Sequence, residues 1–184
     1  MLGGFLEDRH GKLVELLEKS GAPLYTLLTR LTLHEDVAEE LMQELFIKLS
    51  NSSQFDKIQN LGAYVRRAAI NLAFDWRRSQ KRNVLGLDRL NEPASNEKSP
   101  LAKLVQKEEL KEILNAIGQV NKPAREVFVM RYIQQESYDD IAKQLGKTPH
   151  QARALCSRAM NNIRNILGSN NSGLSGKETD NVED

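Results

Sequence analysis

The stretch at residues 137–167, SYDDIAKQLGKTPHQARALCSRAMNNIRNIL, decides how the C-terminal half of this chain folds. Ser137 and Asp140 have the spacing of a capping box, in which a hydroxyl and an acidic side chain satisfy free amides at the start of a helix. Gly146 follows where a helix end favours a left-handed residue. The pattern therefore predicts one short helix between Ser137 and Gly146.

A second helix is predicted to begin almost at once. Thr148 supplies another cap hydroxyl, and Gln151 can return a hydrogen bond to the cap. Pro149 suits the first helical turn, because its missing N–H needs no partner there. We expect this helix to run to about residue 167. A short helix, a glycine turn and a longer helix form a helix-turn-helix, whose second helix enters the major groove of DNA.

The second helix carries side chains suited to reading DNA. Residues 147–164 contain four basic residues and no acidic one. Arginine can donate two bonds to guanine, glutamine can pair with adenine, and serine can hold a phosphate. The outward positions include His150, Gln151, Arg153, Ser157 and Arg158. A plain helical hairpin with a solvated basic face also fits this pattern, and the pattern alone leaves both open.

Residues 83–100 separate this half of the chain from an N-terminal half. They contain Gly86, Pro93 and Pro100 and offer few apolar side chains to bury. We expect a flexible linker that, at about 3.3–3.6 Å per residue, could separate two domains by up to roughly 60 Å. The predicted boundaries are 10–82 for the first domain, 83–100 for the linker, 101–167 for the second domain and 168–184 for a disordered tail.

Apolar residues recur at helical spacing through both halves, and alternating β-branched runs are missing. The sequence predicts an all-α protein of two small helical domains joined by a flexible linker, the second domain a helix-turn-helix. A first helix at 12–33 should be interrupted near Gly21 and Pro23. Further helices are expected at 35–49, at 60–82, from 101, and at about 123–134 after an Asn121 cap. The buried line of the helix at 60–82 should comprise Leu61, Val65, Ala68, Leu72 and Trp76.

Charge is segregated along the chain, although its net value is only +1. Residues 35–48 carry five acidic residues against one lysine. Residues 66–82 carry six basic residues against one aspartate. Opposite charges on separate helices indicate different partners for different faces.

One face of the helix at 60–82 mixes cations with an amide and an aromatic ring. Such mixtures suit DNA strands, because cations follow phosphates while amides and rings meet bases. The alternative is an ordinary solvated helix end, since positive charge complements the C-terminal end of the helix dipole. The residues by themselves leave both interpretations open. This face comprises Arg67, Ile70, Asn71, Phe74, Arg77 and Arg78.

Neither a metal site nor a catalytic site is expected. The single Cys156 permits no internal disulfide, and His10, His34 and His150 are widely scattered. The carboxylates fall on helix surfaces without a histidine or cysteine cluster, which disfavours an enzyme. No apolar run approaches the roughly 18 to 20 residues that span a bilayer, and the first residues lack the order of a secretion signal. We therefore expect no membrane insertion and a cytoplasmic location.

Three segments resemble a known family. AEELMQELFIKL at 38–49 and LGAYVRRAAINLAFDWRRSQKR at 61–82 resemble region 2 of bacterial sigma factors. PAREVFVMRYIQQESYDDIAKQLG at 123–146, with the helix after it, resembles region 4. The order, the spacing and the linker length are similar to those of the extracytoplasmic-function subfamily of the sigma-70 type. The resemblance covers most of the chain.

The resemblance implies a sigma factor that binds core RNA polymerase, recognises promoter DNA, opens the −10 element and initiates transcription without a cofactor. It implies a polymerase-docking face made of Glu40, Gln43, Glu44 and Ile47. It implies −10 contacts by Arg66, Arg67, Asn71, Phe74, Arg77, Arg78, Lys81 and Arg82. It places the helix from Pro149 on the −35 element. An anti-sigma factor is left open as a further partner, and a stand-alone helix-turn-helix regulator is the alternative function.

Overall fold

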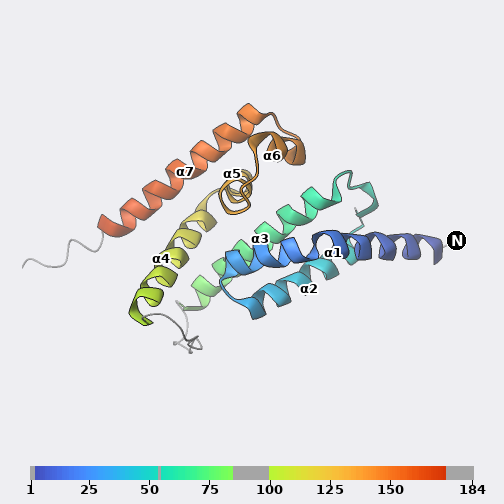
Figure 1. The fold of residues 1–184 in the computed structure, drawn as a ribbon, viewed down its shortest axis with the longest axis horizontal. Helices are drawn as coiled ribbons and strands as arrows, with labels where there is room; N and C mark the ends of the chain where they lie inside the picture. Colours follow the sequence, from blue (N-terminus) through green and yellow to red (C-terminus); the bar gives the residue numbers. More distant parts are fainter. Residues whose placement is uncertain (1–2, 54, 85–99, 173–184) are drawn as a thin grey trace, which may run out of the picture.

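The computed structural model describes residues 3–53, 55–84 and 100–172. Seven α-helices and two short turns of other helix types occupy most of these residues, and no strand occurs among them (Figure 1). The expected all-α class is therefore confirmed. Nearly all of the predicted linker, and the predicted tail after residue 172, lie outside the described residues.

The first three α-helices form what we call the N-terminal unit. Leucines on α1 and α2 pack against the apolar side of α3, and together they form the core of this unit. Burying such side chains removes apolar surface from water, which is the main force that holds small helical bundles together. The elements of this unit are α1 (Gly3–Thr32), α2 (Glu35–Asn51), a 3-10 turn (Phe55–Lys57) and α3 (Leu61–Val84).

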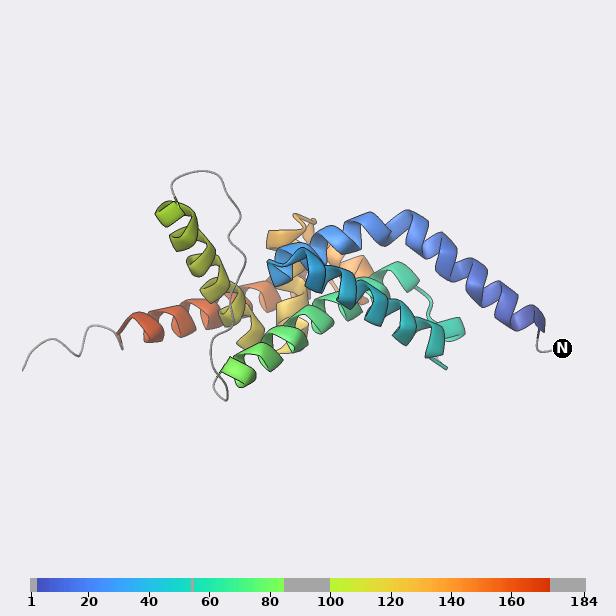
Figure 2. The same ribbon diagram turned by 90° about the horizontal axis from the view of Figure 1, so that it is seen from below.

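Helix α1 runs without a break, so the predicted interruption near Gly21 and Pro23 is wrong. A proline inside a helix removes one N–H and crowds the preceding turn, which bends a helix when packing supports both halves. Figure 2 shows α1 bent near its middle, with its N-terminal part extending away from the rest of the molecule. After the proline, Leu24, Leu28 and Leu31 are buried and hold the helix in register.

The remaining helices form what we call the C-terminal unit. Asn121 caps α5 as predicted, because its Oδ1 accepts from the Ala124 amide at 3.1 Å. The single helix expected at about 123–134 is instead α5 followed by a wider π-helical turn, η2. In such a turn each backbone hydrogen bond spans five residues, one more than in an α-helix. The elements are α4 (Pro100–Gln119), α5 (Lys122–Phe128), η2 (Val129–Ile133), α6 (Tyr138–Leu145) and α7 (Pro149–Ser172).

The predicted helix-turn-helix is confirmed down to its caps. Ser137 Oγ accepts from the Asp140 amide at 3.1 Å, which starts α6. Gly146 ends α6 with φ 61° and ψ 39°, a left-handed conformation that suits glycine. Thr148 and Gln151 then bond reciprocally, with Thr148 N donating to Gln151 Oε1 at 3.0 Å and Gln151 N donating to Thr148 Oγ1 at 3.2 Å.

Helix α3 is the element that both units share. It packs against α1 and α2 within the N-terminal unit and also against α4 and α5 of the C-terminal unit (Figures 1 and 2). The predicted buried line is therefore only partly right: Val65 and Leu72 are buried, whereas Leu61, Ala68 and Trp76 are half-buried. That prediction assumed that other helices pack against only one side of α3. The fully buried residues include Val65, Ala69, Ile70, Ala73 and Phe74.

Candidate nucleic-acid interface

An acidic face lies open on α2. Glu40, Gln43 and Glu44 are exposed, and Ile47 is 60% exposed although it is a large apolar residue. Glu44 forms an ion pair with Lys48 at 2.5 Å, one helical turn away. The opposite side of α2 is the buried one, so the four predicted docking residues come together on one solvent-facing surface. The buried residues are Ala38, Leu41, Leu45 and Leu49.

The first turns of α7 present the predicted −35 readers to solvent. All five of these side chains belong to exposed residues, on the opposite side from buried Ala152, Cys156 and Ala159. The local reason is the alternation of small buried residues with polar exposed ones at helical spacing. The exposed residues are His150, Gln151, Arg153, Ser157 and Arg158.

Gln151 has a second task that restricts its use as a DNA reader. Its side-chain oxygen accepts from the Thr148 amide, so one lone pair of this oxygen is used by the cap. Bidentate pairing with adenine uses both the oxygen and the nitrogen of a glutamine side chain. In this conformation the bond to the cap fixes the Gln151 side chain and leaves its nitrogen and one lone pair of its oxygen for a base, so the residue serves first to start α7.

Tyr138 joins the two helices of the helix-turn-helix, a role that the sequence reading missed. The guanidinium of Arg131 lies 5.0 Å from the centre of its ring, and that of Arg153 lies 5.4 Å from it. Such contacts are favourable cation–π interactions. A hydrogen bond with Cys156, followed by burial, raises the pKa of Tyr138 above its ordinary value. The signal available in the sequence was an aromatic residue directly after the Ser137 cap.

The predicted −10 residues divide into two groups, and the first is open to solvent. Arg78 and Arg82 are exposed on the last turns of α3. Arg78 forms an ion pair with Asp75, three residues earlier on the same helix. The side chain of Lys81 lies outside the described residues.

The second group is covered, and two of its members are interior residues. Phe74 is fully buried and Arg77 is only 8% exposed, so the expectation that they lie on an open DNA-facing side is wrong for this structure. Arg77 donates to the Leu31 carbonyl at 3.2 Å, to the Lys111 carbonyl at 3.0 Å and to Asn115 Oδ1 at 2.9 Å. Burial lowers the pKa of Arg77 below its ordinary value.

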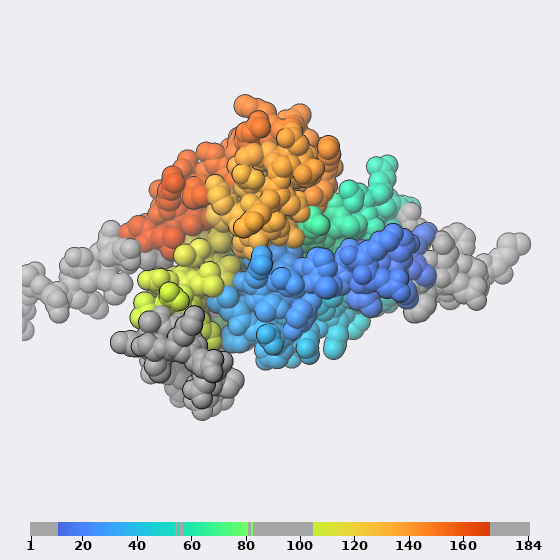
Figure 3. Space-filling view, viewed as in Figure 1, coloured from blue at the N-terminus to red at the C-terminus, as the bar shows by residue number. Residues whose placement is uncertain are grey.

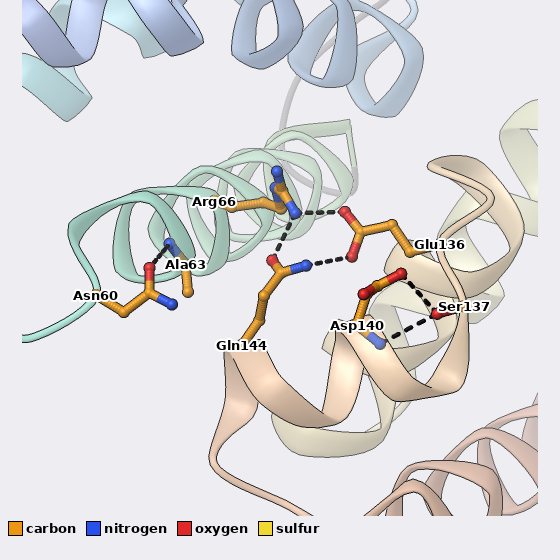
Figure 4. Close-up of polar contacts among 7 residues, drawn as sticks. All are labelled: Asn60, Ala63, Arg66, Glu136, Ser137, Asp140 and Gln144. Carbon is orange, nitrogen blue, oxygen red and sulfur yellow. Dashed lines mark hydrogen bonds and ion pairs between the residues drawn. The ribbon is translucent and has the colours of Figure 1, made fainter.

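Arg66 reaches the C-terminal unit through a polar cluster (Figure 4). Its guanidinium forms an ion pair with Glu136 and donates to Gln144 Oε1 at 2.5 Å. Gln144 in turn donates to Glu136 at 2.6 Å. The three side chains come from α3, from the loop before α6 and from α6 itself, so they tie the two units together.

A second cluster centres on Glu126, whose side chain is only 6% exposed. Its carboxylate accepts from Arg67 Nε at 3.0 Å and from Asn71 Nδ2 at 2.9 Å. Arg125, which is fully buried, donates to Asn71 Oδ1 at 2.8 Å and lies over the Phe74 ring at 4.9 Å. Arg125, Glu126 and Glu136 were not singled out from the sequence, because isolated charged residues normally indicate a solvated surface.

The described residues hold neither a metal-binding cluster nor a membrane-spanning helix. Among residues 3–53, 55–84 and 100–172, no group of three or more His, Cys, Asp or Glu side chains could hold a metal ion. Within the same ranges, every helix is too short or too polar to cross a membrane. The sites of interest are therefore the exposed faces of α2 and α7 and the partly covered face of α3.

Two known protein families match this chain, one over each unit. The family described as Sigma-70 region 2 matches residues 16–83, and the family described as Sigma-70, region 4 matches residues 110–163. The two matches follow in the order that the resemblance predicted. The chain belongs to the sigma-70 family. The N-terminal unit is therefore sigma-70 region 2, and the C-terminal unit is region 4.

Individual sigma factors are also similar to this chain. A probable RNA polymerase sigma factor RfaY from Xanthomonas campestris pv. campestris is 24% identical over 168 residues, which cover 88% of this chain and 41% of the relative. This chain thus spans less than half of the length of that curated relative.

Two solved structures of other proteins are similar to this sigma-70 chain. The sigma factor RpoE, in complex with the anti-sigma factor NepR from Bartonella quintana, has 23% identity and a TM-score of 0.44, covering 84% of this chain and 94% of that one. CnrH, in complex with the cytosolic domain of CnrY, has 18% identity and a TM-score of 0.47, covering 85% of this chain and 88% of that one.

Proposed function

We propose that this chain is a sigma factor of the extracytoplasmic-function type, which binds core RNA polymerase and directs it to promoters. The observation that carries the proposal is the presence of regions 2 and 4 in order, each with its expected binding face exposed at α2 or α7. A chain that carries both regions is expected to recognise promoters, to open the −10 element and to support initiation. No chemical step is assigned to the chain itself.

The acidic face of α2 supports docking on polymerase. Glu40 and Glu44 lie on one exposed surface together with the apolar Ile47. Complementary charge sets the register of such an interface and speeds association, while an exposed apolar residue adds buried area. A basic helical surface on core polymerase is the partner that this face fits.

Helix α7 supports contact with the −35 element. Arg153 and Arg158 are exposed near its start and match the geometry in which a recognition helix reads the major groove with its first turns. Ser157 is placed to hold a phosphate. His150 completes the exposed set, while Gln151 is committed in part to the cap.

Opening of the −10 element is assigned to α3. The exposed Arg78 and Arg82 can follow the phosphates of a separated strand. Capture of an unstacked base costs only a few kcal/mol, so a binding surface is sufficient and no bond chemistry is required. Arg66, Arg67 and Asn71 would join this surface if the C-terminal unit moved away from them.

The alternative of a stand-alone DNA-binding regulator is not favoured. It would use only the C-terminal unit and would leave the acidic face of α2 without a partner. Since core polymerase and the chromosome share the bacterial cytoplasm, we propose that the chain acts there. An anti-sigma factor stays an expectation from the family resemblance.

In vitro transcription on a genomic library, with start sites read by sequencing, tests the proposed function. Core polymerase with this chain should initiate at a defined set of sites that core polymerase alone does not use. Unchanged start sites, together with no association between the chain and core polymerase, would overturn the proposal. A regulator would instead bind its operator without polymerase present.

A further inference from the structure

One side of α7 is buried in the C-terminal unit. Residues three or four positions apart share a face of a helix, and the buried residues of α7 follow this spacing. They pack within the C-terminal unit, where α7 lies against α4, α5 and α6. The opposite side is open, and Figures 1 and 3 show α7 on the outer side of this unit. The buried residues are Ala152, Cys156, Ala159 and Ile163.

Ala154 lies at the centre of the open side of α7. An α-helix turns by about 100° per residue, so the chain has turned by about 200° between Ala152 and Ala154 and faces away from the core. His150, Ser157 and Asn161 share this side at helical spacing, and all three are exposed. These four residues form what we call the central line of α7. Three of them are polar, whereas Ala154 ends in a methyl group.

Two longer side chains next to Ala154 are already engaged with protein groups. The guanidinium of Arg153 lies 5.4 Å from the centre of the Tyr138 ring, so Arg153 is held toward α6. The side-chain oxygen of Gln151 accepts from the Thr148 amide at 3.0 Å, which holds Gln151 at the start of α7. These contacts leave Ala154 to meet a base directly.

The position of Ala154 along α7 is the one from which a base can be contacted. Ala154 is half-buried and follows Pro149, the first residue of α7, by five positions. It therefore belongs to the first turns, which are the part of a recognition helix that contacts base edges. A side chain as short as alanine lets the helix approach the bases closely. Its methyl group can neither donate nor accept a hydrogen bond.

The major groove offers only one apolar group to such a side chain. Guanine, cytosine and adenine present hydrogen-bond donors and acceptors there, while thymine also presents its C5-methyl group. A polar base edge pressed against Ala154 would lose water without gaining a partner, which disfavours binding. A thymine methyl group against the alanine methyl group removes apolar surface from water instead. The chemistry of this position therefore selects thymine.

We propose that Ala154 determines specificity in the −35 contact by packing against the methyl group of one thymine. This inference rests on the proposed function, because it takes α7 as the helix that reads the −35 element. It adds an apolar contact to the polar readers of α7 and fixes one base of the sequence that they recognise.

The first experiment locates the thymine. The full chain selects its preferred sequence from a library of randomised duplex DNA, and each thymine of the selected duplex is then replaced in turn by deoxyuridine. This replacement removes the methyl group and keeps every hydrogen-bonding group. Fluorescence anisotropy should show that binding weakens about three- to fivefold at one position, the size expected for one buried methyl group. A duplex in which no thymine responds to the replacement would overturn the inference.

The second experiment identifies the protein partner of that methyl group. Ala154→Gly removes the alanine methyl group and should bind the thymine and deoxyuridine duplexes equally well. Glycine also weakens the helix, but this cost is shared by both duplexes and cancels from their ratio. A glycine variant that keeps the parent's preference for the thymine duplex would show that Ala154 is not the partner.

The third experiment asks whether this position sets the preferred base. Ala154→Asn supplies an amide that can pair with adenine in two hydrogen bonds, so selection from the same library should now yield adenine in place of thymine. Asn162→Ala is the matched control, because Asn162 is exposed on α7 but lies off the central line. This control should still select thymine. Selection of thymine by Ala154→Asn as well would overturn the inference.

A last arm separates this inference from the proposed function. Core polymerase with Ala154→Asn should initiate at promoters that carry adenine at the selected position. If the library results are as expected but the chain leaves polymerase start sites unchanged, the proposed function fails and the base contact stands. If the parent redirects start sites but no thymine responds to deoxyuridine, the proposed function stands and the contact by Ala154 fails.

Discussion

The guanidinium of Arg153 lies 5.4 Å from the centre of the Tyr138 ring. This contact joins the first residue of α6 to the exposed face of α7, so the short helix orients a predicted DNA reader on the long one. Arg131 lies on the same ring at 5.0 Å. A side chain that is held before DNA arrives loses less conformational freedom on binding.

Tyr138→Leu should therefore weaken binding to a −35 duplex about two- to fivefold, which corresponds to the loss of ~0.5–1 kcal/mol for an exposed cation–π contact. Fluorescence anisotropy with a duplex from a mapped promoter measures it. Tyr138→Phe keeps the ring and should bind like the parent. A Phe variant as weak as the Leu variant would show that the hydroxyl, and not the ring, matters.

Gly146→Ala should destabilise the C-terminal unit by about 1–2 kcal/mol, because an L-residue is strained in the left-handed region. Its φ is 61°, and a Cβ atom there would meet nothing within 4 Å, so backbone strain is the whole effect. Gly11→Ala, in the interior of α1 and equally free of clashes, should be neutral or stabilising. Urea unfolding measures both. Equal effects at the two positions would contradict this account.

Glu40→Lys combined with Glu44→Lys should lower affinity for core polymerase at least about tenfold, because like charges across an interface cost several kcal/mol. Surface plasmon resonance with immobilised core polymerase gives the affinity. Glu15→Lys with Glu18→Lys, two exposed positions on α1, makes the same change of charge elsewhere. Comparable losses in both double variants would mean that net charge, and not the face of α2, governs docking.

Arg77 and Arg78 are adjacent in sequence but should respond in different ways. Arg77→Ala should lower the free energy of unfolding by about 1.5–3 kcal/mol, the range for hydrogen bonds to a charged group, since it removes donors to Leu31, Lys111 and Asn115. Arg78→Ala should change stability by less than about 0.5 kcal/mol, because the residue is exposed.

Arg78→Ala should instead reduce promoter melting by the polymerase complex, which permanganate reactivity of unpaired thymines would detect. Parent-like stability with reduced melting supports a contact to the separated strand. Parent-like melting would remove Arg78 from the −10 surface. Stability measurements come first, so that loss of fold is not mistaken for loss of binding.

Local signals were read correctly wherever the neighbours in sequence are also the neighbours in space. The caps at Asn121, Ser137 and Thr148 form as expected, because each hydrogen bond spans only three residues. The local expectation that a proline interrupts a helix was wrong at Pro23, where buried leucines beyond the proline keep α1 continuous. The π-helical turn η2 was also not predicted, because no short pattern of residues marks such a turn as the cap residues mark a helix start.

The face of α3 was predicted to be open along its whole length, whereas the structure covers part of it with the C-terminal unit. Ile70 and Phe74 were the available hint, since two large apolar residues among cations indicate a covered face. Periodicity reports which residues share a side of a helix, and it does not report what lies against that side.

Residue order alone determined the helical class, the caps, the turn at Gly146 and the opposite charges of α2 and α3, because these depend on interactions within a few residues or on composition. Tertiary structure alone decided that Glu126 and Glu136 meet Asn71 and Arg66 across the two units. Those pairs are separated by 55 and 70 positions in the chain. Contacts over such separations depend on how whole helices pack, which no short pattern encodes.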